Sequence, residues 1–233
     1  MTLICLQAGH EGVTSGATGA PGEQELNVRI RNRLSQVLIS KGFQVQLVNA
    51  NPPQSEIKKD FGLFLALHGD ANVYGTGGGF VDHPEPSTDA ATVESQRIDK
   101  AIEDEYFKNS GIVNHPERSN ANTRYYYMWA RLSAKTPCVI IEMGVVQDAH
   151  DKVILADTDR VVNAIARGIC KAFNVPFDPP TPPAPPVDPC AVQNKQILDL
   201  TSQIKVLNER IVTLTDTVKM LMDKIAKAKA NLS

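Results

Sequence analysis

Short apolar runs alternate with helix-periodic segments from residue 1 to about residue 175, and this alternation constrains the fold more than any other feature. The runs LICLQA, FGLFLAL and CVIIEM are rich in aliphatic and aromatic residues and are bounded by Gly, Asp or Pro, which is typical of buried strands. Strands that alternate with helices favour a parallel sheet. We therefore predict an α/β domain over residues 1–175, with a mainly parallel, twisted sheet flanked by helices.

The clearest predicted helix lies in GEQELNVRIRNRLSQVLISKG. Acidic residues occupy its start, Gly42 ends it, and its apolar residues fall on one face: Leu26, Ile30, Leu34, Val37 and Leu38. A further strand is expected from Phe43, and a shorter one in GGGFVDH after a glycine-rich turn. Other helices are predicted over about 89–108 and 158–173.

Residues 176–189 hold most of the prolines, in VPFDPPTPPAPPVDP. Such a run favours an extended polyproline conformation and acts as a semi-rigid spacer. A ligand for an SH3-type domain is the alternative interpretation, but a linker between two structured parts is favoured.

Residues 190–233 carry a heptad repeat, which predicts a C-terminal coiled-coil helix that mediates oligomerisation. The a and d positions are filled by Ile197, Ile204, Ile211, Val218 and Ile225, and by Leu200, Leu207, Leu214, Leu221 and Ala228. The e and g positions offer no complementary ion pairs, so self-association as a dimer, trimer or tetramer, in either orientation, stays open. Cys190 lies one heptad before Ile197, where an interchain disulfide and a free thiol are both possible.

The composition indicates which classes of partner and which cellular compartment to expect. The chain has 233 residues, 42% of them hydrophobic, and a formal net charge of -2, which suits one sizeable core with a smaller appendage. Lys and Arg are scattered, so no nucleic-acid partner is expected. No segment approaches the roughly 18 apolar residues of a membrane span. The N-terminus enters a strand without a signal peptide, which predicts cytoplasmic folding, with Cys5, Cys138 and Cys170 as buried, reduced thiols.

Four ligand-capable residues lie beside the apolar runs or at the start of the first helix. His10 follows the first strand, Glu23 opens the helix, His68 ends FGLFLAL and Glu142 ends CVIIEM. Side chains at the carboxyl ends of parallel strands line one crevice. Two His and one carboxylate, with a position left for water, form a ligand set of hydrolytic zinc sites. The pattern therefore predicts a metal site with its general base.

With its flanking residues, this pattern resembles the zinc-dependent N-acetylmuramoyl-L-alanine amidases. AGHEG, GEQELN, LHGDAN and PCVIIEMG match in order and spacing, and the resemblance covers about residues 2–175. It implies that His10, Glu23 and His68 bind one Zn²⁺ and that Glu142 activates water. Glu25 is a rival to Glu23, but the family's ligand Glu stands four residues before an Asn, as Glu23 does. The usual GHGG opening is replaced by GHEGVTSGATG, which puts that loop's contacts in doubt.

The resemblance implies a peptidoglycan substrate and hydrolysis of the amide between N-acetylmuramic acid and L-alanine. The lack of a secretion signal is more similar to a bacteriophage endolysin than to a secreted amidase. We therefore expect a lysis enzyme made in the cytoplasm of the infected host and then released to the cell wall. Two alternatives stay open: a zinc peptidase acting on stem peptides, and a non-catalytic wall-binding assembly protein.

Several other residues are candidates for substrate contacts. Asp70 follows His68 closely and is predicted to contact a ligand or the substrate. Arg118 and Arg124 could bind a stem-peptide carboxylate. The run Tyr125 to Tyr127 either walls the groove or enters the core, and surface positions are expected for the remaining histidines, His83, His115 and His150.

Overall fold

The computed structural model describes residues 1–14, 18–71, 75–85, 89–177 and 222. The chain divides into two units, Met1–Pro179 and Pro180–Ser233. The first contains every element described below. The predicted coiled coil and Cys190, and nearly all of the predicted proline-rich linker, lie outside the described residues.

A five-stranded sheet forms the centre of the first unit, in the order β2-β1-β3-β5-β4. Three of the four strand pairs are parallel, and β4 pairs with β5 in the antiparallel direction. The prediction of a mainly parallel sheet is therefore confirmed for these residues. The strands are β1 Leu3–Ala8, β2 Gln44–Val48, β3 Leu63–Asp70, β4 Phe80–Asp82 and β5 Cys138–Val145.

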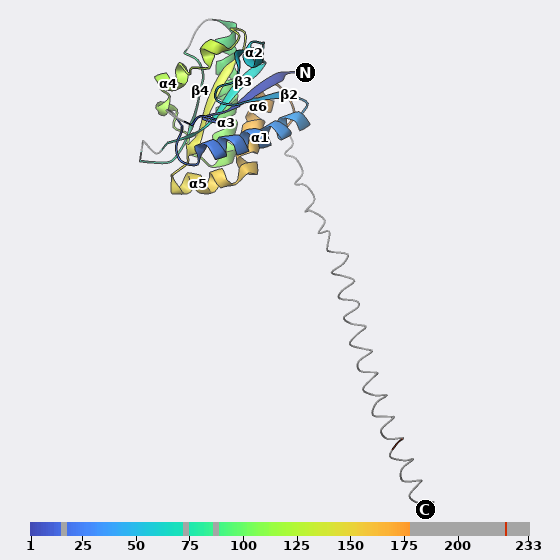
Figure 1. The fold of residues 1–233 in the computed structure, drawn as a ribbon, viewed down its shortest axis with the longest axis vertical. Coiled ribbons are helices and arrows are strands. Elements are labelled where there is room, and N and C mark those ends of the chain that lie inside the picture. Colours follow the sequence, from blue (N-terminus) through green and yellow to red (C-terminus); the bar gives the residue numbers. More distant parts are fainter. Residues whose placement is uncertain (15–17, 72–74, 86–88, 178–221, 223–233) are drawn as a thin grey trace, which may run out of the picture. The chain divides into compact units, whose positions relative to one another are not determined.

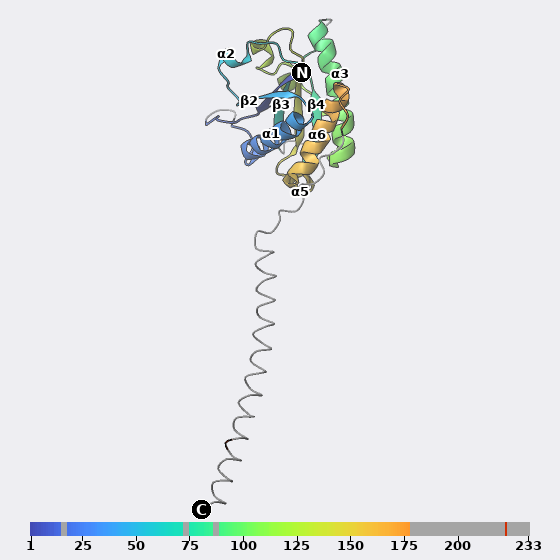
Figure 2. The same cartoon turned by 90° about the vertical axis from the view of Figure 1, so that its right-hand side faces the viewer.

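Three long helices cover one face of the sheet, where α3 and α6 lie side by side (Figure 2). The predicted apolar face of α1 is confirmed, because its five apolar residues are at most 4% exposed. Figure 1 shows α1 and α5 beside the sheet. The helices are α1 Glu23–Ser40, α2 Gln54–Ile57, α3 Ala90–Ser110, α4 Ala121–Arg124, α5 Ala149–Ala156 and α6 Thr158–Ala172, with short 3₁₀ turns at Pro116–Arg118 and Trp129–Arg131.

The opposite face of the sheet packs against α2 and against the irregular segment before β5. A second, smaller apolar cluster forms there, and Tyr126 and Trp129 cover it from the segment after α4. Side chains alternate between the two faces along each strand. At the carboxyl end of the strands, the residues on this second face are polar, and they form part of the site described next. Cys5, Cys138 and Cys170 are buried free thiols, as predicted.

None of the helices within the described residues combines the length and the apolar character that a membrane crossing requires.

Candidate metal centre

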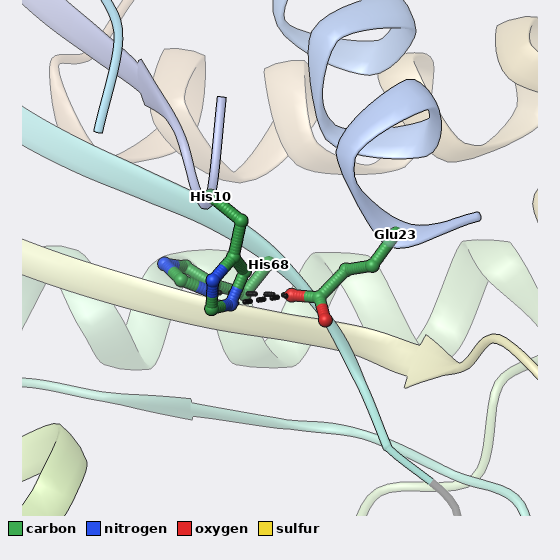
Figure 3. Close-up of side chains that lie close together, drawn as sticks. All are labelled: His10, Glu23 and His68. Carbon is green, nitrogen blue, oxygen red and sulfur yellow. Dashed lines mark ion pairs between the residues drawn. The ribbon is translucent and has the colours of Figure 1, made fainter. Parts of the chain in front are cut away.

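His10, Glu23 and His68 converge at the carboxyl end of the sheet from three separate elements (Figure 3). His10 follows β1, Glu23 is the first residue of α1, and His68 lies near the end of β3. Glu23 Oε1 is 3.1 Å from His10 Nε2 and 3.4 Å from His68 Nδ1. One nitrogen or oxygen atom from each residue lies within 4.8 Å of the others. The structure therefore brings the three predicted metal ligands together.

Burial shifts the pKa values of the two least exposed ligands. Glu23 is 3% exposed and His68 is 5% exposed. Burial by itself raises the pKa of Glu23, but contacts with His10 and His68 and a hydrogen bond from Ala20 N–H outweigh it and lower that pKa to about 2. Burial also lowers the pKa of His68, against the opposing influence of Glu23. At neutral pH the centre thus offers a carboxylate and a neutral imidazole, the forms that bind metal.

The loop that carries His10 is held in a special conformation. His10 has a φ of 61°, in the left-handed region that residues other than glycine rarely adopt. The next residue, Glu11, forms an ion pair with Arg31 of α1, and Arg31 also donates to the Val48 carbonyl over 2.9 Å. These contacts tie the loop to α1 and to β2, so they stabilise the strained position of His10.

Glycines allow the loop to approach the ligands closely. A Cβ atom at Gly9 would lie 2.3 Å from the His68 ring, and one at Gly19 would lie 2.8 Å from the carboxylate of Glu23. Gly19 also has a φ of +80°. Both positions therefore require glycine. At Gly9 there is no space for a Cβ atom, and at Gly19 both the lack of space and the positive φ exclude a side chain.

Glu142 stands beside the three ligands. It pairs with His68 in the register between β5 and β3, so both side chains leave the same face of the sheet. Burial raises the pKa of Glu142 well above its ordinary value, and the negative charges of Asp70 and Glu23 add to this rise. A raised pKa favours the protonated form of the carboxyl group, which a general base needs when it later acts as an acid.

A cavity of about 350 Å³ opens beside the centre. Its walls are His10, Val13, Ala50, Asn51, His68, Tyr126 and Tyr127. Tyr126 also packs against the second apolar cluster, so it both enters the core and lines the cavity, whereas Tyr125 is 67% exposed. The cavity gives a substrate direct access to two of the three ligands.

The residues predicted to bind substrate lie in different surroundings. Asp70 has a buried oxygen, Oδ2, for which the described residues provide no hydrogen-bond partner. Arg118 is 7% exposed and donates to Thr76 Oγ1 over 2.9 Å and to the Gly77 carbonyl over 3.0 Å, so it braces the glycine-rich loop before β4. Arg124 pairs with Glu85 over 3.3 Å. Substrate contacts by these three residues stay predictions.

The remaining titratable candidates lie away from the centre or face solvent. Glu25 is exposed, whereas Glu23 faces the histidines. His150 is exposed, as expected, but His83 and His115 are partly buried. His83 differs from the surface prediction because its Nδ1 lies 2.7 Å from Asp99 Oδ2, a pair that ties the end of β4 to α3.

The ligand atoms of His10, Glu23 and His68 are of the types that bind zinc. Two imidazole nitrogens and one carboxylate oxygen, from side chains that already face one another, match a hydrolytic zinc site. Three ligands leave a position open for water or substrate, and Glu142 is the register partner of His68 in the sheet.

The sequence does not predict two features of the centre: the part that Gln7 plays there and the contact between Tyr126 and His68. Tyr126 Oη lies 3.1 Å from His68 Nε2 and donates a hydrogen bond to Gln7 Oε1 over 3.0 Å. Gln7 is a fully buried amide inside the apolar run LICLQA. A polar side chain in a buried strand needs partners, so this glutamine was the signal that could have revealed the network.

Comparison with known proteins agrees with this geometry. The family model for N-acetylmuramoyl-L-alanine amidase matches residues 4–174, while no curated protein matches the chain. Among solved structures, the amidase AmiC2 of Nostoc punctiforme is 21% identical, with a TM-score of 0.59 over 74% of this chain and 97% of that one.

Two further structures share the fold. The catalytic domain of the amidase CwlV from Bacillus (Paenibacillus) polymyxa var. colistinus is 18% identical, with a TM-score of 0.56 over 76% of this chain and 100% of that one. The catalytic domain of the CD27L endolysin, which targets Clostridia difficile, is 13% identical, with a TM-score of 0.57 over 76% and 100%. Since the family model spans nearly all of the unit that holds the site, the chain belongs to the N-acetylmuramoyl-L-alanine amidase family.

Proposed function

We propose that this peptidoglycan amidase holds one Zn²⁺ with His10, Glu23 and His68 and uses Glu142 to move protons. The observation that carries the proposal is the convergence of three ligand atoms within 4.8 Å beside a carboxyl group whose pKa is raised. Neighbouring strands set this arrangement, because His68 and Glu142 are register partners.

The reaction is hydrolysis of the amide that joins the lactyl group of N-acetylmuramic acid to L-alanine. When bound, zinc supplies a Lewis acid for the scissile carbonyl and for water. Glu142, as a carboxylate, takes a proton from the attacking water. It returns that proton to the alanine nitrogen as the carbon–nitrogen bond breaks, so one residue acts as base and then as acid.

Digestion of purified peptidoglycan tests this proposal. The protein should release new N-terminal alanine without new reducing sugar, lose activity in a chelator and recover it with zinc. Glu142→Gln should lower turnover by about 10²- to 10⁴-fold while zinc stays bound.

Each alternative has its own outcome in this experiment. New N-termini other than alanine would identify a zinc peptidase acting on stem peptides. A protein without zinc that binds the wall and leaves it uncut would be a wall-binding assembly protein. Full turnover by the Glu142→Gln protein would exclude the role given to Glu142.

We also propose the setting in which the enzyme works: a bacteriophage lysis enzyme that folds in the infected host's cytoplasm and then reaches the wall. The fold that it shares with the CD27L endolysin catalytic domain supports this setting. Expression in a bacterial host should cause lysis only when the membrane is permeabilised. Lysis from an intact membrane would argue against it.

The heptads of residues 190–233 support a further part of the proposal, self-association through a coiled coil. Several catalytic domains on one stalk would bind the wall with greater avidity than a single domain.

A further inference from the structure

A chain of hydrogen bonds runs from two backbone carbonyls after β2 to the metal centre. It begins at the carbonyls of Asn49 and Ala50, passes through Gln7 and Tyr126, and ends at His68. The partners come from segments far apart in sequence, since Gln7 and Tyr126 are separated by 119 positions.

The direction of each hydrogen bond follows from the chemistry of the groups. Carbonyl oxygens only accept, so the NH₂ group of Gln7 must face Asn49 and Ala50, at 3.3 and 3.1 Å. The Gln7 Oε1 atom then points toward Tyr126 and accepts its hydroxyl proton over 3.0 Å. Because a tyrosine hydroxyl has one proton, Tyr126 Oη can only accept from His68 Nε2.

This direction favours one tautomer of His68. A neutral imidazole carries one proton, and a proton on Nε2 leaves the lone pair on Nδ1. Nδ1 is the atom that faces Glu23, 3.4 Å from Oε1, so Glu23 and Tyr126 compete for the imidazole proton. We infer that Gln7 and Tyr126 are positioning residues that favour the tautomer in which Nδ1 of His68 can bind the metal. The inference rests on the proposed zinc site.

The competing tautomer shows why this network is needed. With its proton on Nδ1, His68 would donate to Glu23 Oε1, and a metal would have to displace that proton. The Tyr126 hydroxyl favours the other tautomer by offering an acceptor to Nε2. The Tyr126 ring also contacts the His68 ring edge to face, at 88° and 5.5 Å between centroids, which restricts the imidazole plane.

Two variants separate the hydroxyl of Tyr126 from general effects on the fold. Tyr126→Phe keeps the ring and removes only the acceptor for His68. Tyr125→Phe is the matched control, because Tyr125 is 67% exposed and its hydroxyl takes no part in this chain of hydrogen bonds. Competition with a chromophoric chelator should show about 10- to 100-fold weaker zinc binding for Tyr126→Phe. The Tyr125→Phe protein should bind zinc within about threefold of the unchanged protein.

A second measurement reads the tautomer directly in the metal-free protein. Imidazole ¹⁵N chemical shifts of His68 should show a larger fraction of the Nε2-protonated tautomer in the unchanged protein than in Tyr126→Phe. Equal zinc affinities, or equal tautomer fractions, for the unchanged protein and Tyr126→Phe would overturn the inference. If the unchanged protein itself failed to bind zinc, the zinc site would be refuted as well.

Discussion

Replacement of Glu23 by glutamine gives a quantitative test of the centre without its metal. Glutamine has nearly the same shape as a protonated glutamate, so Glu23→Gln removes the charge and keeps the packing. The fall of the Glu23 pKa from 4.5 to about 2 means that the fold prefers the carboxylate to the neutral form. At about 1.4 kcal/mol per pH unit, that preference amounts to about 3 kcal/mol.

The expected result is a lower free energy of unfolding at pH 7, by about 3 kcal/mol, for the metal-free variant. For a domain of this size the melting temperature falls by about 2–4 °C per kcal/mol, which gives about 6–12 °C. The pKa is depressed in the folded state, so the carboxylate's contribution is present above about pH 4.5. It is lost as the pH falls toward 2, and the two proteins should then converge.

Thermal unfolding followed by circular dichroism, in chelator and at several pH values, measures this difference. Glu25→Gln is the matched control, since Glu25 lies in the same first turn but is exposed. Its melting temperature should stay within about 1–2 °C of the unchanged protein, because surface substitutions change stability by about 0.5 kcal/mol or less. Equal melting temperatures for Glu23→Gln and Glu25→Gln at pH 7 would refute the reasoning.

Three other predictions concern Glu142, Gly9 and the C-terminal heptads. Glu142→Gln should raise the melting temperature of the metal-free protein at pH 8, because the raised pKa means that an ionised Glu142 destabilises the folded state. Differential scanning calorimetry should show that this gain in melting temperature disappears below about pH 4.5. Gly9→Ala should abolish tight zinc binding in a chelator competition, because its Cβ would collide with His68. Sedimentation should show an oligomer for the full chain and a monomer for residues 1–175, and a monomeric full chain would exclude the coiled coil.

The elements of the first unit could be predicted because their signals are local. The five residues of the predicted apolar face of α1 recur with the helical period, and all five are buried. Predicted strands such as CVIIEM and FGLFLAL became the central strands β5 and β3 because fully buried strands need continuous apolar runs. The segment around Tyr126 was harder to predict, since its irregular backbone has no period.

The candidate ligands could also be predicted, because parallel strands carry their carboxyl ends to one edge. His10 follows β1, His68 lies near the end of the neighbouring strand β3, and Glu23 opens the helix between them. The choice of Glu23 over Glu25 came from the family spacing, and the structure places Glu23 against both histidines. Arg118 was predicted to bind a stem-peptide carboxylate, and the structure shows it donating to the Gly77 carbonyl in the loop before β4.

The sequence by itself determined which elements form and which residues end them, because helical and strand periods and turn residues act over a few positions. Tertiary structure alone decided the electrostatics and hydrogen bonding of the centre. The raised pKa of Glu142 depends on burial and on charges from β3 and α1, and the orientation of His68 depends on Tyr126 and Gln7. These contacts join residues 58 to 119 positions apart in the sequence, and only packing brings them together.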